Sequence, residues 1–187
     1  MYTVINATRE YLLKYPEFLV DLKNFCVKAS QDHRLPAHVN MYWDDAPPTL
    51  FTQIFERNVY DEGKGILSLA YDDSDNLAGV SGAYKLYETI ALVGARTWTA
   101  PEHRTKWVHG NHIFPKQFEW AKENGYEEAW MTFNNYNDRL FKFLKRINEG
   151  KGTGFGIKNS EVYKGLEFAE DMMNINSTDQ YVAMKKL

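Results

Sequence analysis

Apolar positions in the first third of the chain change from one period to another. Residues 2–6 alternate between apolar and polar side chains, which predicts a short strand. From Thr8 onward, apolar residues recur every three or four positions and predict one face of a helix. Pro16 lies within this pattern, so the segment is either two helices or one kinked helix. The period stops over residues 31–48, where we expect a loop, and a short helix is expected over residues 50–57.

The middle of the chain carries three consecutive extended patterns. Residues 65–71 and 77–87 are both strand-like, and the DDSDN cluster at 72–76 between them has the composition of a turn. Together they predict a β-hairpin. Residues 89–99 form a third extended run, rich in small and β-branched side chains, and Pro101 ends it.

The second half of the chain alternates helical and extended patterns. A helix is predicted from the spacing of Ile113, Phe114, Phe118 and Ala121, with Gly125 as its C-terminal stop. The segments that follow are a strand at 128–133, a helix at 137–147, a glycine-rich link at 149–156 and strands at 162–168 and 180–186. No repeat or interdomain linker interrupts them. We therefore expect residues 1–187 to form a single α/β (α+β) domain, a mixed sheet of about seven strands flanked by helices.

The composition excludes several classes of partner. A net charge of -3 leaves no basic footprint for a nucleic-acid backbone, so no nucleic-acid partner is expected. No apolar run approaches the roughly 20 residues that span a bilayer, and residues 1–13 lack the order of a signal peptide. The single cysteine, Cys26, cannot form an internal disulfide. We expect a cytoplasmic protein without a membrane partner.

Four segments in a fixed order carry a resemblance to a known family. They are LAG at 77–79, TAPEHR at 99–104, FEWAKENGYEEAWMTFN at 118–134 and an N-x-x-N-x-x-x-x-x-F pattern at 134–143, and YVAMKKL at 181–187 follows them. In this order and spacing they resemble the GNAT superfamily of N-acyltransferases. The similarity extends over nearly the whole chain.

The resemblance implies that acetyl-coenzyme A, or another acyl-coenzyme A, is the co-substrate, bound where the third extended segment separates from the strand beginning near Glu128. A helix N-terminus with nearby glycines suits its pyrophosphate, because backbone N–H groups and the helix dipole face the anion. The cofactor-binding residues implied are Trp98 and Thr99 for the pantetheine and thioester, Arg104 and the backbone of Val108, His109, Gly110 and Asn111 for the pyrophosphate, and Asn134 for the pantetheine arm. Asn134 is equally suited to capping the helix that follows.

The pyrophosphate-binding segment departs from the family pattern R/Q-x-x-G-x-G/A. Arg104 is present, but Trp107 and His109 stand at the two glycine positions and Gly110 comes one residue late. Pro115 is tolerated only in a first helical turn, which places the start of this helix near Asn111. Two interpretations stay open: Gly110 takes over the role of the displaced glycine, or the Trp107 indole fills the pyrophosphate position.

The usual catalytic side chains of the family are also missing. The resemblance implies an oxyanion donor from the backbone near Trp98 or Thr99, but residues 89–100 contain no carboxylate to act as a base. Glu88 is the nearest replacement. The family's general-acid tyrosine, which follows the Phe143 position, is replaced by Leu144, and Tyr136 could reach the same space. Tyr136 and Glu88 are therefore the catalytic candidates.

Aromatic residues could line the acceptor site. Tyr42 and Trp43 lie on the expected loop, and Tyr84 lies on a central strand, where aromatics are also common in cores. Asp44 and Asp45 beside them would favour a cationic amine. The partner expected is a small-molecule or peptide amine, and a homodimer stays open.

Two further patterns have ordinary explanations. His103, His109 and His112 lie close in sequence, but no cysteine or carboxylate cluster completes a metal site, so no metal is expected. The glycines at 150–156 lack the context of a phosphate loop and indicate a flexible connection. Three hypotheses follow: an N-acyltransferase, a GNAT-like module that binds a ligand or protein without catalysis, and an unrelated α/β binding protein.

Overall fold

The structure is a computed structural model that describes residues 1–32, 54–55, 65–134, 138–151, 157 and 160–187. Its strands are β1 (Thr3–Ala7), β2 (Ile66–Tyr71), β3 (Leu77–Tyr87), β4 (Ile90–Thr99), β5 (Glu128–Phe133), β6 (Leu166–Phe168), β7 (Met173–Ile175) and β8 (Thr178–Lys186). Its α-helices are α1 (Arg9–Lys14), α2 (Glu17–Ser30), α5 (Phe114–Glu123) and α6 (Asp138–Asn148). Three shorter turns are η2 (Pro101–Lys106), η3 (His109–Ile113, a π turn) and η5 (Ser160–Tyr163).

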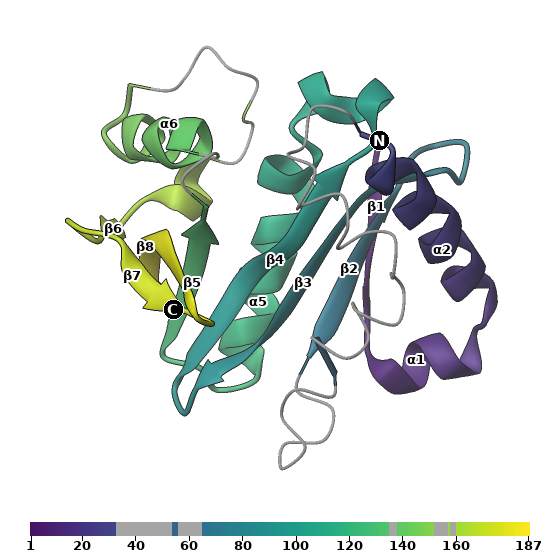
Figure 1. The fold of residues 1–187 in the computed structure, drawn as a ribbon, viewed down its shortest axis with the longest axis horizontal. Coiled ribbons are helices and arrows are strands. Elements are labelled where there is room, and N and C mark those ends of the chain that lie inside the picture. Colours follow the sequence, from purple (N-terminus) through teal and green to yellow (C-terminus); the bar gives the residue numbers. More distant parts are fainter. Residues whose placement is uncertain (33–53, 56–64, 135–137, 152–156, 158–159) are drawn as a thin grey trace.

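The strands form one mixed sheet in the order β1-β2-β3-β4-β5-β8-β6, with β7 paired to β8. Each of these pairs is antiparallel except β4 and β5, which run parallel. α5 connects the two parallel strands and lies behind the sheet, while α1 and α2 lie beside β1 and β2 (Figure 1). The expected α/β fold, a large mixed sheet flanked by helices, is confirmed.

Two residues divide the first helical pattern into α1 and α2. The Thr8 hydroxyl oxygen accepts a hydrogen bond of 3.2 Å from the Tyr11 amide and caps α1. Pro16 directly precedes α2, where its missing N–H is not needed. Of the two alternatives, the chain therefore takes the two-helix form. Most of the loop expected over residues 31–48 and most of the helix expected over residues 50–57 lie outside the described residues.

The C-terminal region differs from the predicted strand at 162–168. Tyr163 belongs to η5 and is completely buried, and Gly165 has a φ of 73°, so the strand β6 begins only at Leu166. The period of two did not predict β7. It forms a hairpin with β8 through Asn176 and Ser177, both in the left-handed region.

The helix expected to begin near Asn111 is preceded by a π turn, and α5 itself begins at Phe114. The π turn η3 begins at His109, and Asn111 lies inside it rather than at its cap. Pro115 is placed in the first turn of α5, as the sequence required.

The two faces of the sheet bury separate apolar clusters. On one face, Leu22 and Phe25 of α2 pack with Trp98 of β4 and other core residues. On the other face, residues of α5 and α6 such as Phe118 and Phe141 pack with β5 and β8. Both helical layers are therefore held by the usual burial of one apolar helix face.

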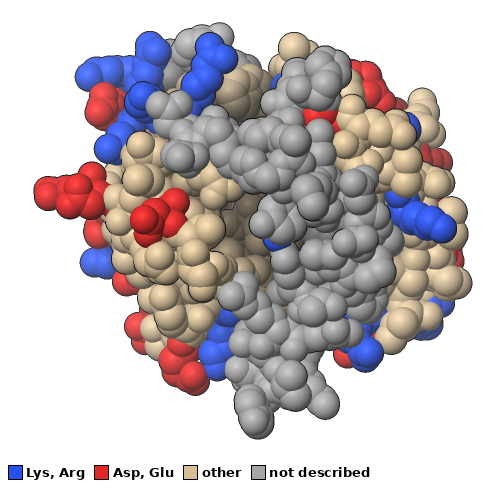
Figure 2. Space-filling view, in the orientation of Figure 1, with Lys and Arg blue, Asp and Glu red and all other residues tan. Residues whose placement is uncertain are grey.

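The parallel strands β4 and β5 stay paired for only part of their length. Ile90–Val93 pairs with residues 128–131, but β4 continues to Thr99 and β5 to Phe133. On the β3 side, the β4 register shifts on both sides of Gly82, and Gly94 and Arg96 have positive φ values. These bulges bend β4 away from β5. The strands diverge in Figure 1, and the surface is hollowed between them in Figure 2.

Candidate functional site

The site begins at the end of β4, where two predicted cofactor residues lie. Trp98 is buried, packs edge-on against Phe25 at a ring distance of 4.7 Å, and donates a 2.9 Å hydrogen bond from Nε1 to Asp32. The indole therefore belongs to the α2 face of the sheet. At Trp98, only the backbone remains available to a pantetheine arm. Thr99 follows, with its hydroxyl group directed to His109 at 2.8 Å.

Arg104 is neutralised by a carboxylate that lies 72 positions away in the sequence. Its guanidinium forms an ion pair with Asp32, which is 8% exposed, and its Nε donates to the Thr99 carbonyl at 3.1 Å. The guanidinium carbon also lies 5.6 Å from the centre of the Trp98 ring. Arg104 thus ties the segment after β4 to the end of α2. Nothing local in the sequence marks Asp32 as its partner.

His109, at one of the expected glycine positions, is a neutral side chain inside the fold. Its Nε2 lies 3.1 Å from the Val80 carbonyl, which can only accept, so Nε2 carries the hydrogen and Nδ1 accepts from the Thr99 hydroxyl. Burial lowers the pKa of His109 to about 4. A Cβ added at Gly79 would lie 3.1 Å from the His109 ring, so Gly79 makes room for this imidazole.

The segment that the sequence predicts to bind the pyrophosphate directly follows η2. Val108 and Gly110 are buried, and the Asn111 amide donates to the Trp107 carbonyl at 2.8 Å. Tyr163 donates its hydroxyl hydrogen to the Gly110 carbonyl at 2.6 Å, and burial raises the pKa of this phenol. The C-terminal half of the chain therefore holds the π turn in place.

Trp107 bridges the two segments that follow β4 and β5, at the end where these strands have separated. It stacks on Phe143 of α6 with ring centres 4.5 Å apart and planes inclined by 16°. The stack joins the segment that follows β4 to the helix that follows β5. Trp107 also has a φ of 51°, in the left-handed region that glycine favours. The backbone keeps the conformation of the expected glycine although the side chain is large.

The remaining predicted residues lie apart from this arrangement. Asn134 directly follows β5 at its divergent end, whereas Glu88 lies in the β3–β4 turn at the opposite end of β4, about 30 Å from Thr99 by strand length. The Glu88 side chain is 90% exposed and pairs with Lys85 at 3.0 Å. Tyr42, Trp43 and Tyr136 lie outside the described residues.

Tyr84 lies on the α2 face of the sheet and meets the β7–β8 turn. It is 5% exposed, and its hydroxyl oxygen accepts a 3.0 Å hydrogen bond from the Asn176 side chain. This contact brings β3 and the C-terminal hairpin together. Tyr84, which was predicted to contact the acceptor, is therefore a buried residue whose hydroxyl group is hydrogen-bonded to the C-terminal hairpin.

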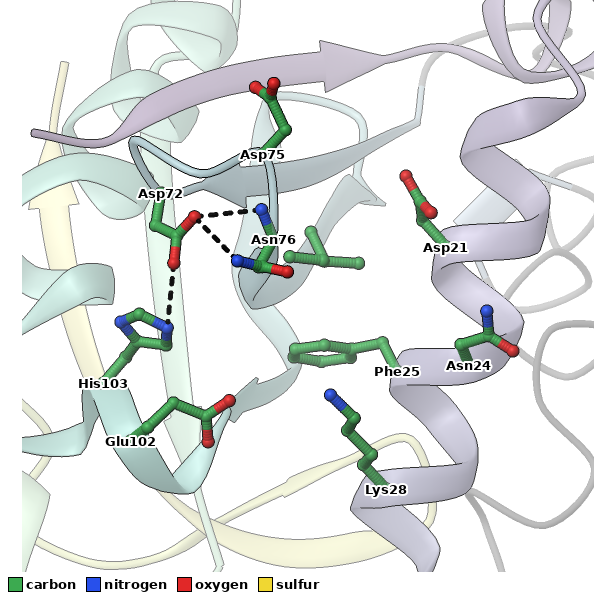
Figure 3. Close-up of a pocket in the computed structure, with 10 residues that line it drawn as sticks. Asp21, Asn24, Phe25, Lys28, Asp72, Asp75, Asn76, Glu102 and His103 are labelled. Carbon is green, nitrogen blue, oxygen red and sulfur yellow. Dashed lines mark hydrogen bonds and ion pairs between the residues drawn. The ribbon is translucent and has the colours of Figure 1, made fainter.

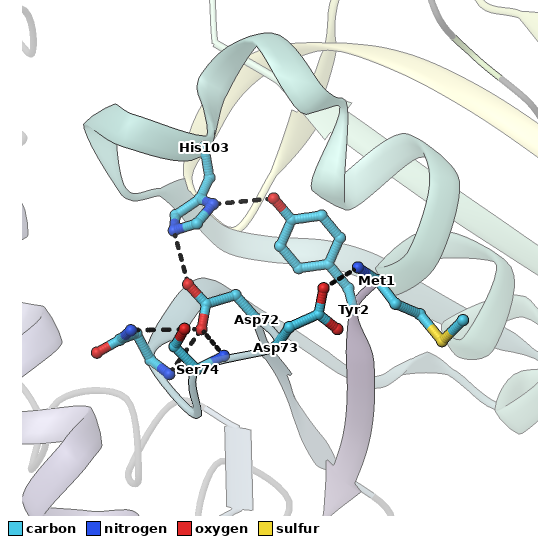
Figure 4. Close-up of polar contacts among 7 residues, drawn as sticks. Met1, Tyr2, Asp72, Asp73, Ser74 and His103 are labelled. Atoms are coloured by element: carbon cyan, nitrogen blue, oxygen red, sulfur yellow. Dashed lines mark hydrogen bonds and ion pairs between the residues drawn. The ribbon is translucent and has the colours of Figure 1, made fainter.

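A second set of contacts fixes η2 from the other side. His103 Nδ1 lies 2.8 Å from the Tyr2 hydroxyl, and its Nε2 lies 3.5 Å from Asp72 (Figure 4). Hydrogen bonds from the backbone amides of Asn76 and Ser74 lower the pKa of Asp72. η2 is thus attached to β1 and to the β2–β3 turn.

A hollow of about 440 Å³ lies beside this attachment, between α2, the β2–β3 turn and η2 (Figure 3). Carboxylates and one ammonium group line it: Asp21, Asp72, Asp75, Glu102 and Lys28.

Within the described part of the chain, no three His, Cys, Asp or Glu side chains come together to hold a metal ion. None of the described helices is long and apolar enough to cross a membrane.

Comparison with known proteins gives a clear result for the fold. No protein-family model and no curated protein sequence matches the chain. Among solved structures, the PaiA N-acetyltransferase of Thermoplasma acidophilum in complex with coenzyme A is 14% identical, with a TM-score of 0.57 over 100% of this chain and 99% of that one. Spermidine N-acetyltransferase of Vibrio cholerae in complex with CoA and spermine is 12% identical, with a TM-score of 0.52 over 99% and 95%. A GNAT-family acetyltransferase of Staphylococcus aureus Mu50 is 10% identical, with a TM-score of 0.56 over 100% and 99%. The chain has the fold of these acetyltransferases.

Proposed function

Because the chain has the GNAT fold, we propose that it is an N-acyltransferase that moves an acetyl or other short acyl group from coenzyme A to a primary amine. The divergence of β4 from β5 beyond Val93 and Met131 carries this proposal. Beyond these residues the facing edges of the two parallel strands no longer pair with each other, and such a gap suits a narrow, amide-containing chain like pantetheine.

Different residues along the gap between β4 and β5 would bind different parts of coenzyme A. The backbone of Trp98 and Thr99 would bind the pantetheine and thioester, and Asn134 would bind the pantetheine arm at the β5 side. The backbone of residues 108–111 would meet the pyrophosphate at the start of η3 and α5. The charge of Arg104 is already neutralised by Asp32, so we do not assign it to the pyrophosphate. Arg104 would instead support the site by holding the Thr99 carbonyl.

Catalysis in this proposal depends mainly on positioning. Bound acyl-coenzyme A supplies a thioester that is already reactive towards amines. A backbone N–H near Trp98 or Thr99 would stabilise the oxyanion, and Tyr136 would protonate the departing thiolate. Glu88 is left out of the proposed mechanism because it lies at the wrong end of β4. Water would carry the proton from the amine, and alignment of the two substrates would supply much of the rate.

The acceptor would approach from the α2 face of the sheet. Tyr84 and the β7–β8 turn form a wall there, joined by the bond between Tyr84 and Asn176. The Vibrio cholerae spermidine N-acetyltransferase, which shares the fold, was crystallised with the amine spermine. A small-molecule or peptide amine is therefore the acceptor class that we propose, in a reducing cytoplasm where the lone Cys26 stays a thiol.

Two observations favour a second candidate, a GNAT-like binding module without catalysis. The Trp107–Phe143 stack occupies the end of the gap where the pyrophosphate would enter. Residues 90–99 of β4 also contain no carboxylate. In this alternative the fold is kept and the gap serves another ligand or a protein partner.

Calorimetric titration with acetyl-coenzyme A tests the two candidates. Free coenzyme A and desulfo-coenzyme A serve as matched controls for the contribution of the acyl group and the sulfur. Micromolar binding supports the transferase and leads to a screen of amines and peptide N-termini. Lack of binding at millimolar cofactor contradicts it and favours the binding module.

A further inference from the structure

A buried hydrogen-bond network lies where α5 crosses the sheet. Gln117 of α5 has no exposed surface. Its Oε1 accepts from the Gly94 amide at 2.9 Å, and its Nε2 donates to the Ser81 carbonyl at 3.1 Å. An amide N–H can only donate and a carbonyl can only accept, so these two backbone groups fix the orientation of the Gln117 side chain.

The network continues from Gln117 to the first strand. Nε2 of Gln117 also donates to the Ser68 hydroxyl oxygen at 3.2 Å, and that hydroxyl donates to the Asn6 side chain at 2.7 Å. Asn6 in turn donates to the Lys116 carbonyl of α5 at 3.2 Å. One buried glutamine therefore connects α5 with β2, β3 and β4, and through Ser68 with β1.

Gly94 stands at the point where β4 leaves β5. It follows Val93, the last residue of β4 in the β5 ladder, and its φ of 77° turns the backbone out of the strand conformation. Its carbonyl accepts a 2.8 Å hydrogen bond from the Thr97 hydroxyl, while its amide is bonded to Gln117. Both polar backbone groups of Gly94 are thus engaged by β4 and α5.

We infer that Gln117 is the positioning residue of the cofactor gap, and this inference rests on the proposed function. By holding the Gly94 amide towards α5, Gln117 keeps β4 bent away from β5 beyond Val93. An apolar side chain at this position would leave the half-buried Gly94 amide without this acceptor and would remove one donor from the Ser81 carbonyl. Extension of the β4–β5 ladder past Val93 and Met131 would offer the Gly94 amide a new acceptor, so we expect the strands to close together and the gap to narrow.

The first test compares Gln117→Met with Asn6→Ala. The methionine has a similar length but can neither accept from Gly94 nor donate to Ser81, whereas Asn6→Ala removes the outer end of the network and leaves both bonds intact. We expect Gln117→Met to raise the dissociation constant for coenzyme A at least tenfold and Asn6→Ala to change it less than twofold. Thermal unfolding of each variant establishes that the protein titrated is folded.

Two more variants separate positioning from general stability. Thr97→Val removes the other bond to Gly94 from an exposed position, and it should weaken coenzyme A binding in a protein that folds normally. Gln117→Glu should bind weakly at pH 8 and recover towards pH 5.5, because only a protonated carboxyl can both accept from Gly94 and donate to Ser81. If the variant is folded at both pH values by thermal unfolding, this recovery assigns the loss of binding to the position of β4 and not to unfolding.

The possible failures are distinct. Wild-type protein that does not bind coenzyme A overturns the proposed function and this inference with it. Wild-type protein that binds, together with Gln117→Met binding within twofold of it, overturns the inference alone. The inference is also overturned if Asn6→Ala weakens binding as much as Gln117→Met does.

Discussion

The two sides of the gap are held by different kinds of interaction. On the β4 side, side chains distant in sequence bond directly to the strand or the segment after it: Asp32 through Arg104, His109 to Thr99, and Gln117 to Gly94. On the α6 side, two aromatic stacks make the corresponding contacts. Phe141 stacks on Tyr181 with ring centres 5.0 Å apart, and Phe143 stacks on Trp107.

This difference separates a fixed side from an adjustable one. Hydrogen bonds depend strongly on distance and angle, whereas stacked rings can shift against each other at small cost. We therefore expect the β4 side to set the position of the backbone that would bind the thioester. Entry of a cofactor would be accommodated at the contact between Trp107 and Phe143.

The largest expected effect tests the fixed side by removing its buried charge. Asp32→Ala should lower the free energy of unfolding by about 3 kcal/mol, because it leaves the Arg104 guanidinium and the Trp98 N–H without their carboxylate. Urea denaturation measures this change. Glu119→Ala is the control, since its ion pair with Lys116 is half exposed and should contribute less than about 0.5 kcal/mol. Equal effects would contradict a fixed β4 side.

The pH dependence of stability tests the same side through His109. The folded pKa of about 4 lies below the usual unfolded value near 6.5, so below pH 6.5 the unfolded state binds more protons than the folded state. The neutral His109 therefore contributes about 3 kcal/mol to the free energy of unfolding. This contribution is complete above pH 6.5 and disappears as the pH falls to 4. Denaturation at several pH values should show the slope in wild-type protein and a flatter slope in His109→Asn. An unchanged slope in the variant would rule out a neutral, buried His109.

A third prediction addresses the adjustable side. Trp107→Gly removes the ring stack and relieves the positive φ, so we expect coenzyme A to bind about tenfold more tightly, a change of about 1.4 kcal/mol. Titration calorimetry measures the affinity. Phe143→Leu keeps the indole but removes its stacking partner, and it should give a smaller gain. Weaker binding by Trp107→Gly would show instead that the indole forms part of the binding surface.

The smallest effect concerns the contact between the π turn and the C-terminal half. Tyr163→Phe should cost about 1 kcal/mol, because the buried Gly110 carbonyl loses its donor while the ring packing stays. Thermal or urea unfolding measures the loss. Tyr87→Phe, at a position that is half exposed, should be neutral. A neutral result at Tyr163 would mean that another group satisfies the carbonyl.

Much of the fold could be predicted because its signals are local. Residues 77–87 and 128–133 form strands with the predicted bounds, and Pro16 separates two helices. The exceptions follow from tertiary packing. Tyr163 leaves the predicted strand to bury its ring and bond to Gly110, a distant residue that no local period can reveal.

The candidate site was less accessible to sequence reasoning. The sequence pointed to Arg104 and His109 as neighbours of a phosphate and to Thr99 as a neighbour of the thioester. The structure shows that they engage Asp32, one another and the Val80 carbonyl. Gln117 gave no signal, because a polar residue within a helix is normally exposed. Its burial depends on how α5 crosses three strands, which the sequence alone does not specify.

Because Gly79 lies close to His109, substitutions at these two positions should depend on each other during evolution. A methyl group at Gly79 would meet the His109 ring at 3.1 Å and the Val108 and Ile113 side chains at 3.3 and 3.4 Å. Replacement of Gly79 by alanine would thus require these neighbours to move by a few tenths of an ångström, and a smaller residue at position 109 would remove the tightest of the three contacts. In the reverse direction, restoring the glycine pattern of the pyrophosphate-binding segment would leave a vacancy beside Gly79. The two positions should therefore vary together, and a lineage that returns to the glycine pattern should carry a larger residue at position 79.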